Sequence, residues 1–176
     1  MRTGNVIGMV LFLCVLAAPG VAQEAPAPAA APAEAPNPDG LVVGENVVPG
    51  MPLSQAIELL GVPGSLRVNR GPIQGTDSIQ IDYEQHGLIL HAMSNGSTVE
   101  GIEVGPSFKG KFASGIKLGD KFPMLIENYG VPNSLTSQVA RYPDRGLYFL
   151  MNNDTLLSAK AYAKGTKLVD ARLMNP

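Results

Sequence analysis

The stretch LGVPGSL (Leu60–Leu66) returns later in the chain, nearly unchanged, as YGVPNSL (Tyr129–Leu135). At a spacing of 69 residues, Val47–Leu66 and Ile116–Leu135 are identical at eight of 20 positions. Two copies are fewer than a solenoid needs, because each solenoid unit buries its core against neighbours on both sides. The duplication therefore predicts two related units that pack side by side.

The similarity resumes at YEQHGL (Tyr83–Leu88) and YPDRGL (Tyr142–Leu147), where the spacing falls to 59. The first copy thus holds extra residues, and RGPIQGTDS (Arg70–Ser78) is the expected insertion because its Gly and Pro favour a long hairpin loop. In both hexapeptides, glycine occupies the place where a tight turn needs a positive φ.

Each copy begins with the pattern of a short amphipathic helix. Apolar residues recur at i, i+3, i+4 and i+7, as Leu53, Ala56, Ile57 and Leu60 and again as Phe122, Leu125, Ile126 and Tyr129. Pro52 suits a first helical turn, and Asp120 suits an N-cap. A helix of about ten residues is not stable alone in water, so each must pack on a sheet.

The tripeptide Gly-Val-Pro predicts where both helices end. Gly61 and Gly130 occupy the position of a left-handed residue just past the helix, and Pro63 and Pro132 prevent the helix from continuing. These four residues are therefore predicted to be structural.

Strand patterns fill the remainder of each copy. We expect strands at 65–69, 78–84, 88–93 and 98–104 in the first copy, and at 134–142, 147–152 and 156–163 in the second. Turn sequences such as SNGS and NND join them, so the connections are short and the pairing antiparallel. The tail after Gly165 is ambiguous. The predicted fold class is α+β: two tandem αβ repeats, each a short helix packed on an antiparallel β-meander.

The N-terminus, residues 1–22, has the features of a secretory signal peptide. Arg2 supplies the positive charge, Val6–Ala18 is an apolar run of 13 residues, and small residues precede Gln23. A retained anchor is the alternative, although spanning a bilayer takes about 20 apolar residues. The single cysteine, Cys14, would leave with the signal, so the mature chain would contain no disulfide.

Residues 23–39 form an Ala/Pro-rich segment that lacks the apolar side chains needed for a core. It is either a semi-rigid tether or a disordered tail. The predicted organisation is thus a signal peptide (1–22), a linker (23–39) and two αβ repeats (40–105 and 106–176). The expected location of the mature protein is periplasmic or secreted.

Two longer phrases carry a resemblance to a known group. VVPGMPLSQAIELLGVP (Val47–Pro63) and GIKLGDKFPMLIENYGVP (Gly115–Pro132) both join an apolar residue and Gly to a short amphipathic helix ending in Gly-x-Pro. This pattern, with the downstream Tyr-x-x-x-Gly-Leu, resembles the half-repeat of exported bacterial proteins with the β-lactamase-inhibitor-like fold. That group includes small outer-membrane assembly lipoproteins and β-lactamase inhibitory proteins. The resemblance implies a non-enzymatic binder, although the lipoprotein cysteine signal is absent here.

No catalytic motif stands out. The chain contains no G-x-S-x-G, no P-loop and no H-E-x-x-H. His86 is expected in a turn and His91 on the next strand, with side chains on opposite sides, so a shared metal site is not expected. Asp82 and Glu84 alternate with apolar residues, which favours a solvated strand face over an acid–base pair. We therefore predict no enzyme, no cofactor and no metal.

The two copies differ most in charge. Leu41–Gly105 has seven acidic and two basic residues, whereas Pro106–Pro176 has five acidic and ten basic residues. The difference reflects either solvated faces that attract each other or a dipolar surface that steers a charged partner. Four lysines, at 109, 111, 117 and 121, suit an anionic envelope surface. Nucleic acid is not an expected partner, because few aromatic residues accompany the basic ones.

These observations predict an exported, non-enzymatic protein-binding module of the bacterial cell envelope that binds another envelope or secreted protein through a sheet face. The alternatives are a secreted inhibitor of a hydrolase and a small-ligand carrier or enzyme. The residues predicted to contact a partner are Lys109, Lys111, Lys117, Lys121, Tyr83, Tyr142 and Arg145.

Overall fold

A computed structural model describes residues 40–71 and 75–168, all of which belong to one compact unit. The predicted signal peptide and linker, and the end of the tail from residue 169, lie outside the described residues. In chain order the elements are β1 (Val42–Val43), α1 (Leu53–Leu60), β2 (Ser65–Asn69), β3 (Ser78–Tyr83), β4 (Leu88–Met93), β5 (Val99–Val104), β6 (Lys111–Phe112), α2 (Phe122–Tyr129), β7 (Ser134–Leu135), β8 (Val139–Tyr142), β9 (Leu147–Asn152) and β10 (Thr155–Tyr162).

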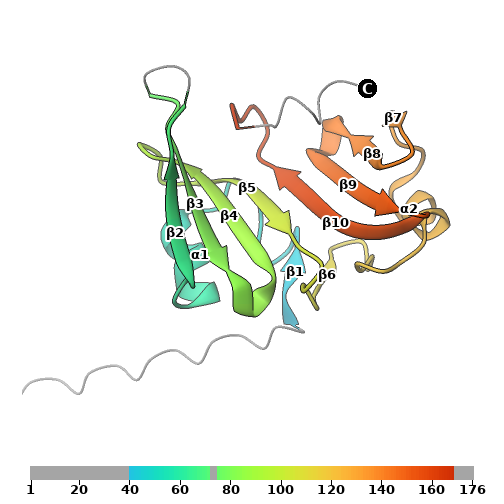
Figure 1. The fold of residues 1–176 in the computed structure, drawn as a ribbon, viewed down its shortest axis with the longest axis horizontal. Coiled ribbons are helices and arrows are strands. Elements are labelled where there is room, and N and C mark those ends of the chain that lie inside the picture. Colours follow the sequence, from blue (N-terminus) through green and yellow to red (C-terminus); the bar gives the residue numbers. More distant parts are fainter. Residues whose placement is uncertain (1–39, 72–74, 169–176) are drawn as a thin grey trace, which may run out of the picture. The chain divides into compact units, whose positions relative to one another are not determined.

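Eight of the strands form one antiparallel sheet, in the order β2-β3-β4-β5-β10-β9-β8-β7 (Figure 1). The described residues include only two α-helices, each eight residues long. The predicted fold class, α+β with two tandem αβ repeats, is therefore wrong. The protein is mainly β, and its centre is a single continuous sheet rather than two separate helix-and-meander units.

The sheet is continuous because β5 and β10 pair with each other. Ala159 and Ala161 of β10 lie opposite Val104 and Ile102 of β5, and all four side chains are buried. A separate sheet in each half would instead leave β5 and β10 as open edges, with unpaired backbone groups and apolar side chains in water. Pairing of the two strands removes both edges at once.

A short parallel pair also ties distant parts of the chain together. Val42 and Val43 of β1 pair with Lys111 and Phe112 of β6, across the boundary predicted after Gly105. Neither strand was predicted from the sequence, because a strand of two residues is too short to show an alternating pattern. Phe112 is buried in the main core cluster, so the β1–β6 pair is anchored to the core.

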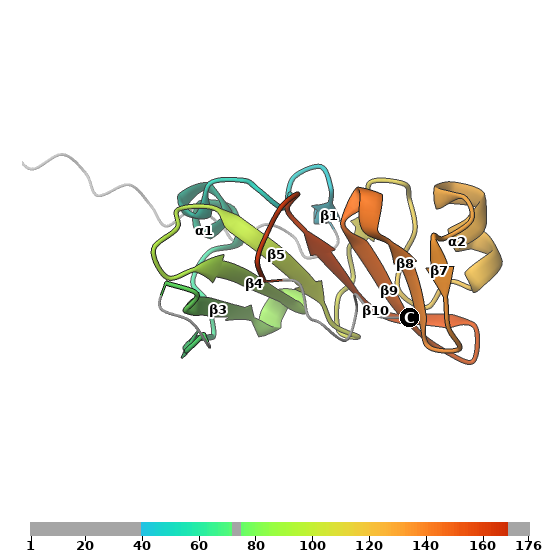
Figure 2. The same ribbon diagram turned by 90° about the horizontal axis from the view of Figure 1, so that it is seen from above.

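Both helices cover the same face of the sheet, as Figures 1 and 2 show. Ala56 and Leu60 of α1 and Leu125 of α2 are buried in one core cluster with the inward side chains of the strands. We call this the core face, and the opposite side of the sheet the outer face. Hydrophobic burial of this kind stabilises helices too short to persist alone.

The Gly-Val-Pro segments end the helices as predicted, but in a different backbone conformation. Gly61 has φ 78° and ψ −150°, and Gly130 has φ 81° and ψ −170°, so φ is positive but neither residue is in the left-handed helical region. The region that they do occupy, with positive φ and ψ near ±150–180°, is open essentially only to glycine. Each amide N–H bonds the carbonyl four residues earlier, and Pro63 and Pro132 follow in the chain.

Two predicted details of the second copy are wrong. Asp120 does not cap α2; its carboxylate accepts the N–H of Lys117 at 2.8 Å in the preceding turn, and Lys121 holds the N-cap position without a side-chain hydrogen bond. The predicted strand 134–142 is two strands. A turn divides it, in which the N–H of Val139 bonds the Oγ1 of Thr136 at 3.1 Å.

The predicted hairpin turns are confirmed. Gly87 and Gly146 end 3₁₀ turns at φ 65° and 66°, in the left-handed region. Asn153 and Asp154 also have positive φ and join β9 to β10 in two residues. The insertion after Arg70 links β2 to β3 as a hairpin, with Asn69 opposite Ser78.

Candidate functional site

The residues predicted to contact a partner do not gather into one site. The four lysines are exposed along the connection from β5 to α2: Lys109, Lys111, Lys117 and Lys121. The Nζ of Lys121 donates to the Oγ1 of Thr155 at 2.6 Å, so this ammonium group is held at the start of β10. The lysines are exposed and so available to an anionic surface, but none of them lines the pocket described below.

The two tyrosines of the paired hexapeptides belong to the core instead of a binding surface. Tyr83 and Tyr142 are buried, and the hydroxyl of Tyr142 donates to the carbonyl of Gly130 at 2.8 Å, just past α2. The hydroxyl of Tyr83 is buried without a hydrogen-bond partner among the described residues. Burial raises the pKa of both phenols. Neither ring can contact a partner directly.

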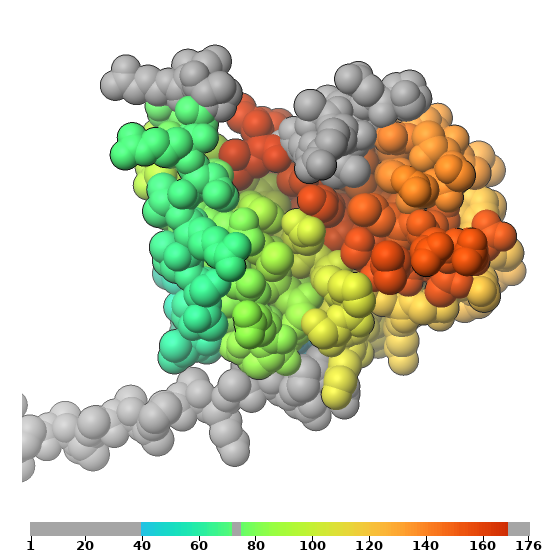
Figure 3. Space-filling view, in the orientation of Figure 1, coloured from blue at the N-terminus to red at the C-terminus, as the bar shows by residue number. Residues whose placement is uncertain are grey.

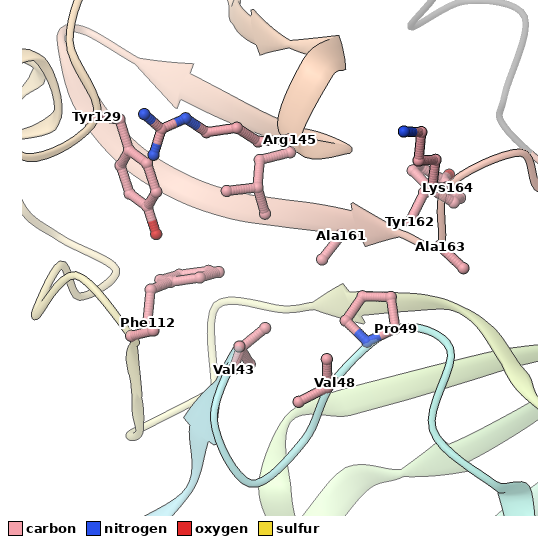
Figure 4. Close-up of a pocket in the computed structure, with 13 residues that line it drawn as sticks. Val43, Val48, Pro49, Phe112, Tyr129, Arg145, Ala161, Tyr162, Ala163 and Lys164 are labelled. Atoms are coloured by element: carbon pink, nitrogen blue, oxygen red, sulfur yellow. The ribbon is translucent and has the colours of Figure 1, made fainter.

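Arg145 is the predicted residue that lies at a pocket (Figure 4). The pocket has a volume of about 390 Å³, within the usual range for small-ligand sites. One wall comes from β1 and the segment after it, through Val43, Val48 and Pro49. The other comes from β6, β9 and β10, through Phe112, Leu147 and Ala161. These contributors are far apart in the sequence, so the pocket exists only in the folded chain.

The polar and charged side chains among the lining residues are those of Tyr129, Arg145, Tyr162 and Lys164. The Arg145 guanidinium lies over the Tyr129 ring, 5.6 Å from its centroid, at a distance that allows a cation–π interaction (Figure 4). Burial raises the pKa of the Tyr129 phenol, and the neighbouring Ser114 and Arg145 oppose that rise. The phenol thus stays protonated at neutral pH and can donate a hydrogen bond.

The corresponding place in the first copy has different chemistry. Arg145 aligns with His86, and Tyr129 aligns with Leu60. His86 is buried, and its Nε2 lies 3.1 Å from the carbonyl oxygen of Leu60, at the end of α1. Arg145 is instead exposed at the rim of the pocket. Histidine contributes to the core in one half, whereas arginine leaves a positive charge at the surface in the other.

A second group of polar residues lies at the centre of the outer face. The carboxylate of Glu103 on β5 is 3.2 Å from the Nζ of Lys160 on β10 and 3.5 Å from the Nε2 of His91 on β4. The hydrogen bond from His91 and the charge of Lys160 together hold the pKa of Glu103 below its ordinary value, against the effect of burial.

His91 and His86 lie on opposite sides of the sheet, as predicted. His91 faces Glu103 on the outer face, whereas His86 contacts the end of α1 on the core side.

We expect this ion pair to make the free energy of unfolding depend on pH in the acidic range. Glu103→Gln should cost about 0.5–1 kcal/mol near neutral pH, a modest loss because the Glu103 side chain is still 31% exposed. The folded-state pKa lies below the ordinary value of 4.5, so the contribution is present above pH 4.5 and is lost as pH falls through the lower folded pKa. Urea unfolding of parent and variant between pH 7 and pH 3 measures this difference.

Glu100→Gln provides the control on the same strand, because the carboxylate of Glu100 accepts a hydrogen bond from Thr98 and forms no ion pair among the described residues. The change with pH that the Glu103 variant shows beyond that of the Glu100 variant is the part that comes from the ion pair. A Glu103→Gln difference that stays constant down to pH 3 would show that the ion pair does not contribute.

A scan against protein-family models and searches of curated proteins and of solved structures found no match to this chain. Within the described part of the chain, no helix has the length and apolar character to cross a membrane. Among the same residues, no three His, Cys, Asp or Glu side chains are grouped so that they could hold a metal ion.

Of the pocket residues, Arg145 alone was predicted from the sequence to contact a partner. Tyr129 was part of the apolar pattern of the second helix, and Lys164 was one of ten bases in the second half. Glu103 and Lys160 lie 57 positions apart, so only the pairing of β5 with β10 brings them together. One signal of the pocket was present in the sequence. His86 and Arg145 occupy the same position of the two aligned hexapeptides but differ in chemistry.

Proposed function

We propose that this protein is an exported, non-enzymatic module of the bacterial cell envelope that binds another protein through the outer face of its sheet. The observation that carries the proposal is that both helices pack on the core face. The outer face of β3, β4 and β5 has no helix over it in the described residues, and Figure 3 looks onto this side of the molecule.

The side chains on this part of the outer face suit a protein partner. Polar and apolar residues alternate across neighbouring strands, and all are partly exposed: Gln80 and Asp82 on β3, Ile89, His91 and Met93 on β4, and Glu103 on β5. A mixture of this kind is typical of non-obligate protein interfaces. The half built from β9 and β10 is less suitable, because Tyr148 and Tyr162 on its outer face are already buried.

The edge of the sheet borders this surface. Among the described residues β2 pairs with β3 alone, and most of its residues are exposed. Arg67 lies opposite Gln80 on the outer face, whereas the exposed Leu66 and Val68 lie opposite Ile81 and Ile79 on the core side. An exposed edge strand offers backbone N–H and C=O groups that an extended segment of a partner can pair with. The proposed interface therefore comprises the outer face of β3–β5 together with this edge.

Site-specific photo-crosslinking in intact cells tests the proposal. A benzophenone amino acid replaces Gln80 or Ile89 on the outer face, and in the matched control it replaces Gln55 on the exposed side of α1. We expect crosslinks to one protein from the first two positions and none from Gln55. Mass spectrometry then identifies the partner, and cell fractionation with N-terminal sequencing of the mature protein tests export.

Several outcomes would contradict the proposal. These are the absence of a crosslinked protein at both outer-face positions, a partner captured only from α1, and turnover of a substrate by the purified protein. If the captured partner is a hydrolase that the purified protein inhibits, the result favours the alternative of a secreted inhibitor.

A further inference from the structure

We propose that the pocket shown in Figure 4 binds a small anionic amphiphile, that is, a molecule with one carboxylate and an apolar chain or ring. The inference does not rest on the proposed protein-binding function, because the pocket is lined mainly by residues of the core side, such as Phe112, Leu147 and Ala161, and by none of the outer-face residues of β3–β5. Three observations carry it: the shape and lining of the pocket, its charge, and its position in the second half of the chain.

The lining favours an apolar body. Valine, proline, leucine, alanine and phenylalanine side chains from both walls form most of the surface, and the aromatic ring of Phe112 lies between them (Figure 4). Phe112 packs edge-on against the buried Phe149, with ring centroids 5.3 Å apart, so the floor of the pocket is held by the main core. A preformed apolar recess gains binding free energy by releasing water from its walls and from the ligand.

The charges favour a negative head group. Arg145 and Lys164 are the charged residues that line the pocket, and no acidic residue lines it. Neither cation forms a salt bridge with a carboxylate among the described residues. The Arg145 guanidinium is positioned by the Tyr129 ring, so its donors are partly oriented before a ligand arrives. A carboxylate can accept charge-assisted hydrogen bonds from such a group.

The pocket lies where the two halves of the chain differ. At the aligned place in the first half, His86 is buried against the end of α1 and presents no exposed cation. In the second half, tyrosine replaces leucine at the end of the helix and arginine replaces histidine in the turn, so a phenol and a charge lie next to apolar walls. A core role alone explains the histidine, but it does not explain an exposed arginine stacked at the rim of a recess.

The test uses decanoate as the probe, below its micelle concentration, with decanol and decyltrimethylammonium as neutral and cationic analogues of equal chain length. Binding is measured by isothermal titration and by displacement of an anionic naphthalene fluorophore from the purified protein. We expect decanoate to bind at least about tenfold more tightly than decanol, and the cationic analogue to bind least, because only the carboxylate can accept charge-assisted hydrogen bonds from the cations at the pocket.

Two sets of variants locate the site. Arg145→Ala with Lys164→Ala should reduce the preference for decanoate over decanol to about threefold or less, because the charge at the pocket is removed. Lys109→Ala with Lys117→Ala removes the same net charge from exposed positions that do not line the pocket, and should leave binding unchanged. Ala113→Phe places a ring in the recess and should abolish binding of both decanoate and decanol, while thermal unfolding shows that the variant remains folded.

Four results would overturn the inference. Decanoate fails to bind, or it binds no more tightly than decanol. The two exposed lysine substitutions weaken binding as much as the pair at the pocket, which would mean that net charge alone attracts the anion. Ala113→Phe remains folded and binds decanoate as the parent does, which would place the ligand elsewhere.

Discussion

Gly146→Ala is expected to destabilise the protein by on the order of 3 kcal/mol or more. Gly146 ends the 3₁₀ turn before β9 at φ 66°, in the left-handed region that side chains other than glycine rarely adopt. A Cβ at this position would also overlap the carbonyl oxygen of Tyr162, the last residue of β10. The amide N–H of Tyr162 bonds the carbonyl of Gly146 at 2.8 Å, so the turn cannot move away without breaking that bond. Urea unfolding at neutral pH measures the loss.

Gly130→Ala tests backbone strain where no steric overlap is present. Gly130 also has a positive φ, of 81°, but with ψ −170°, and a Cβ there would meet no atom within 4 Å. Only backbone strain then opposes the change, and we expect a loss of about 1–2 kcal/mol. Because the two glycines differ in ψ, the steric part is judged at Gly146 itself: a loss of only about 1 kcal/mol for Gly146→Ala would show that the close approach to Tyr162 contributes nothing. No loss in either variant would exclude the positive φ values.

Phe149→Ala is expected to cost about 4 kcal/mol, because it removes a large side chain that has no solvent exposure. The Phe149 ring lies at the centre of an aromatic cluster. Its centroid is 5.3 Å from that of Phe112, 5.5 Å from that of Tyr129 and 6.1 Å from that of Tyr142. Such contacts contribute beyond the area that they bury. Chemical denaturation measures the change in the free energy of unfolding.

Two further variants keep this prediction measurable. Phe149→Leu retains most of the volume and should cost roughly 1–2 kcal/mol, so it reports on the site even if the alanine variant does not fold. Val131→Ala, at a position 82% exposed, should change stability by no more than about 0.5 kcal/mol. A loss below about 1.5 kcal/mol for Phe149→Ala would contradict a tightly packed aromatic core.

The aromatic cluster also links stability to the candidate pocket. Phe112 and Tyr129 contact Phe149 on one side and line the pocket on the other. A change at Phe149 should therefore affect the floor of the pocket and the ring under Arg145 together. The exposed cations themselves are not part of this packing, which is why their removal is expected to change ligand preference and not folding.

Local structure was largely predictable from the sequence. The residues of both helices, the glycines that end them and the turns at Gly87 and Gly146 were each predicted within a few positions. These features depend on neighbours in the chain, because an amphipathic repeat, a positive φ or a proline acts over only a few residues. Two local predictions were wrong: the N-cap at Asp120 and the single strand 134–142. In both places a side chain bonds a nearby backbone N–H, that of Lys117 or Val139, and so competes with the predicted structure.

The assembly of these elements was not predictable in the same way. The duplicated motif suggested two units, each with its own helix and sheet, whereas the chain forms one sheet with a shared core. Nothing in the pattern of β5 or β10 says which edge each will pair with, since that depends on apolar surface contributed by residues far away. Small side chains at Ala159 and Ala161 fit opposite Val104 and Ile102, and this fit is visible only once the strands are side by side.

The sequence by itself determined the turns, the ends of the helices and the opposite charges of the two halves. Tertiary structure alone decided that Tyr83 and Tyr142 belong to the core, that Glu103 meets Lys160, and that Arg145 shares a pocket with Lys164. The physical reason is the range of the forces involved. Backbone conformation is set within a few residues, whereas burial and charge pairing depend on which distant surfaces exclude water together.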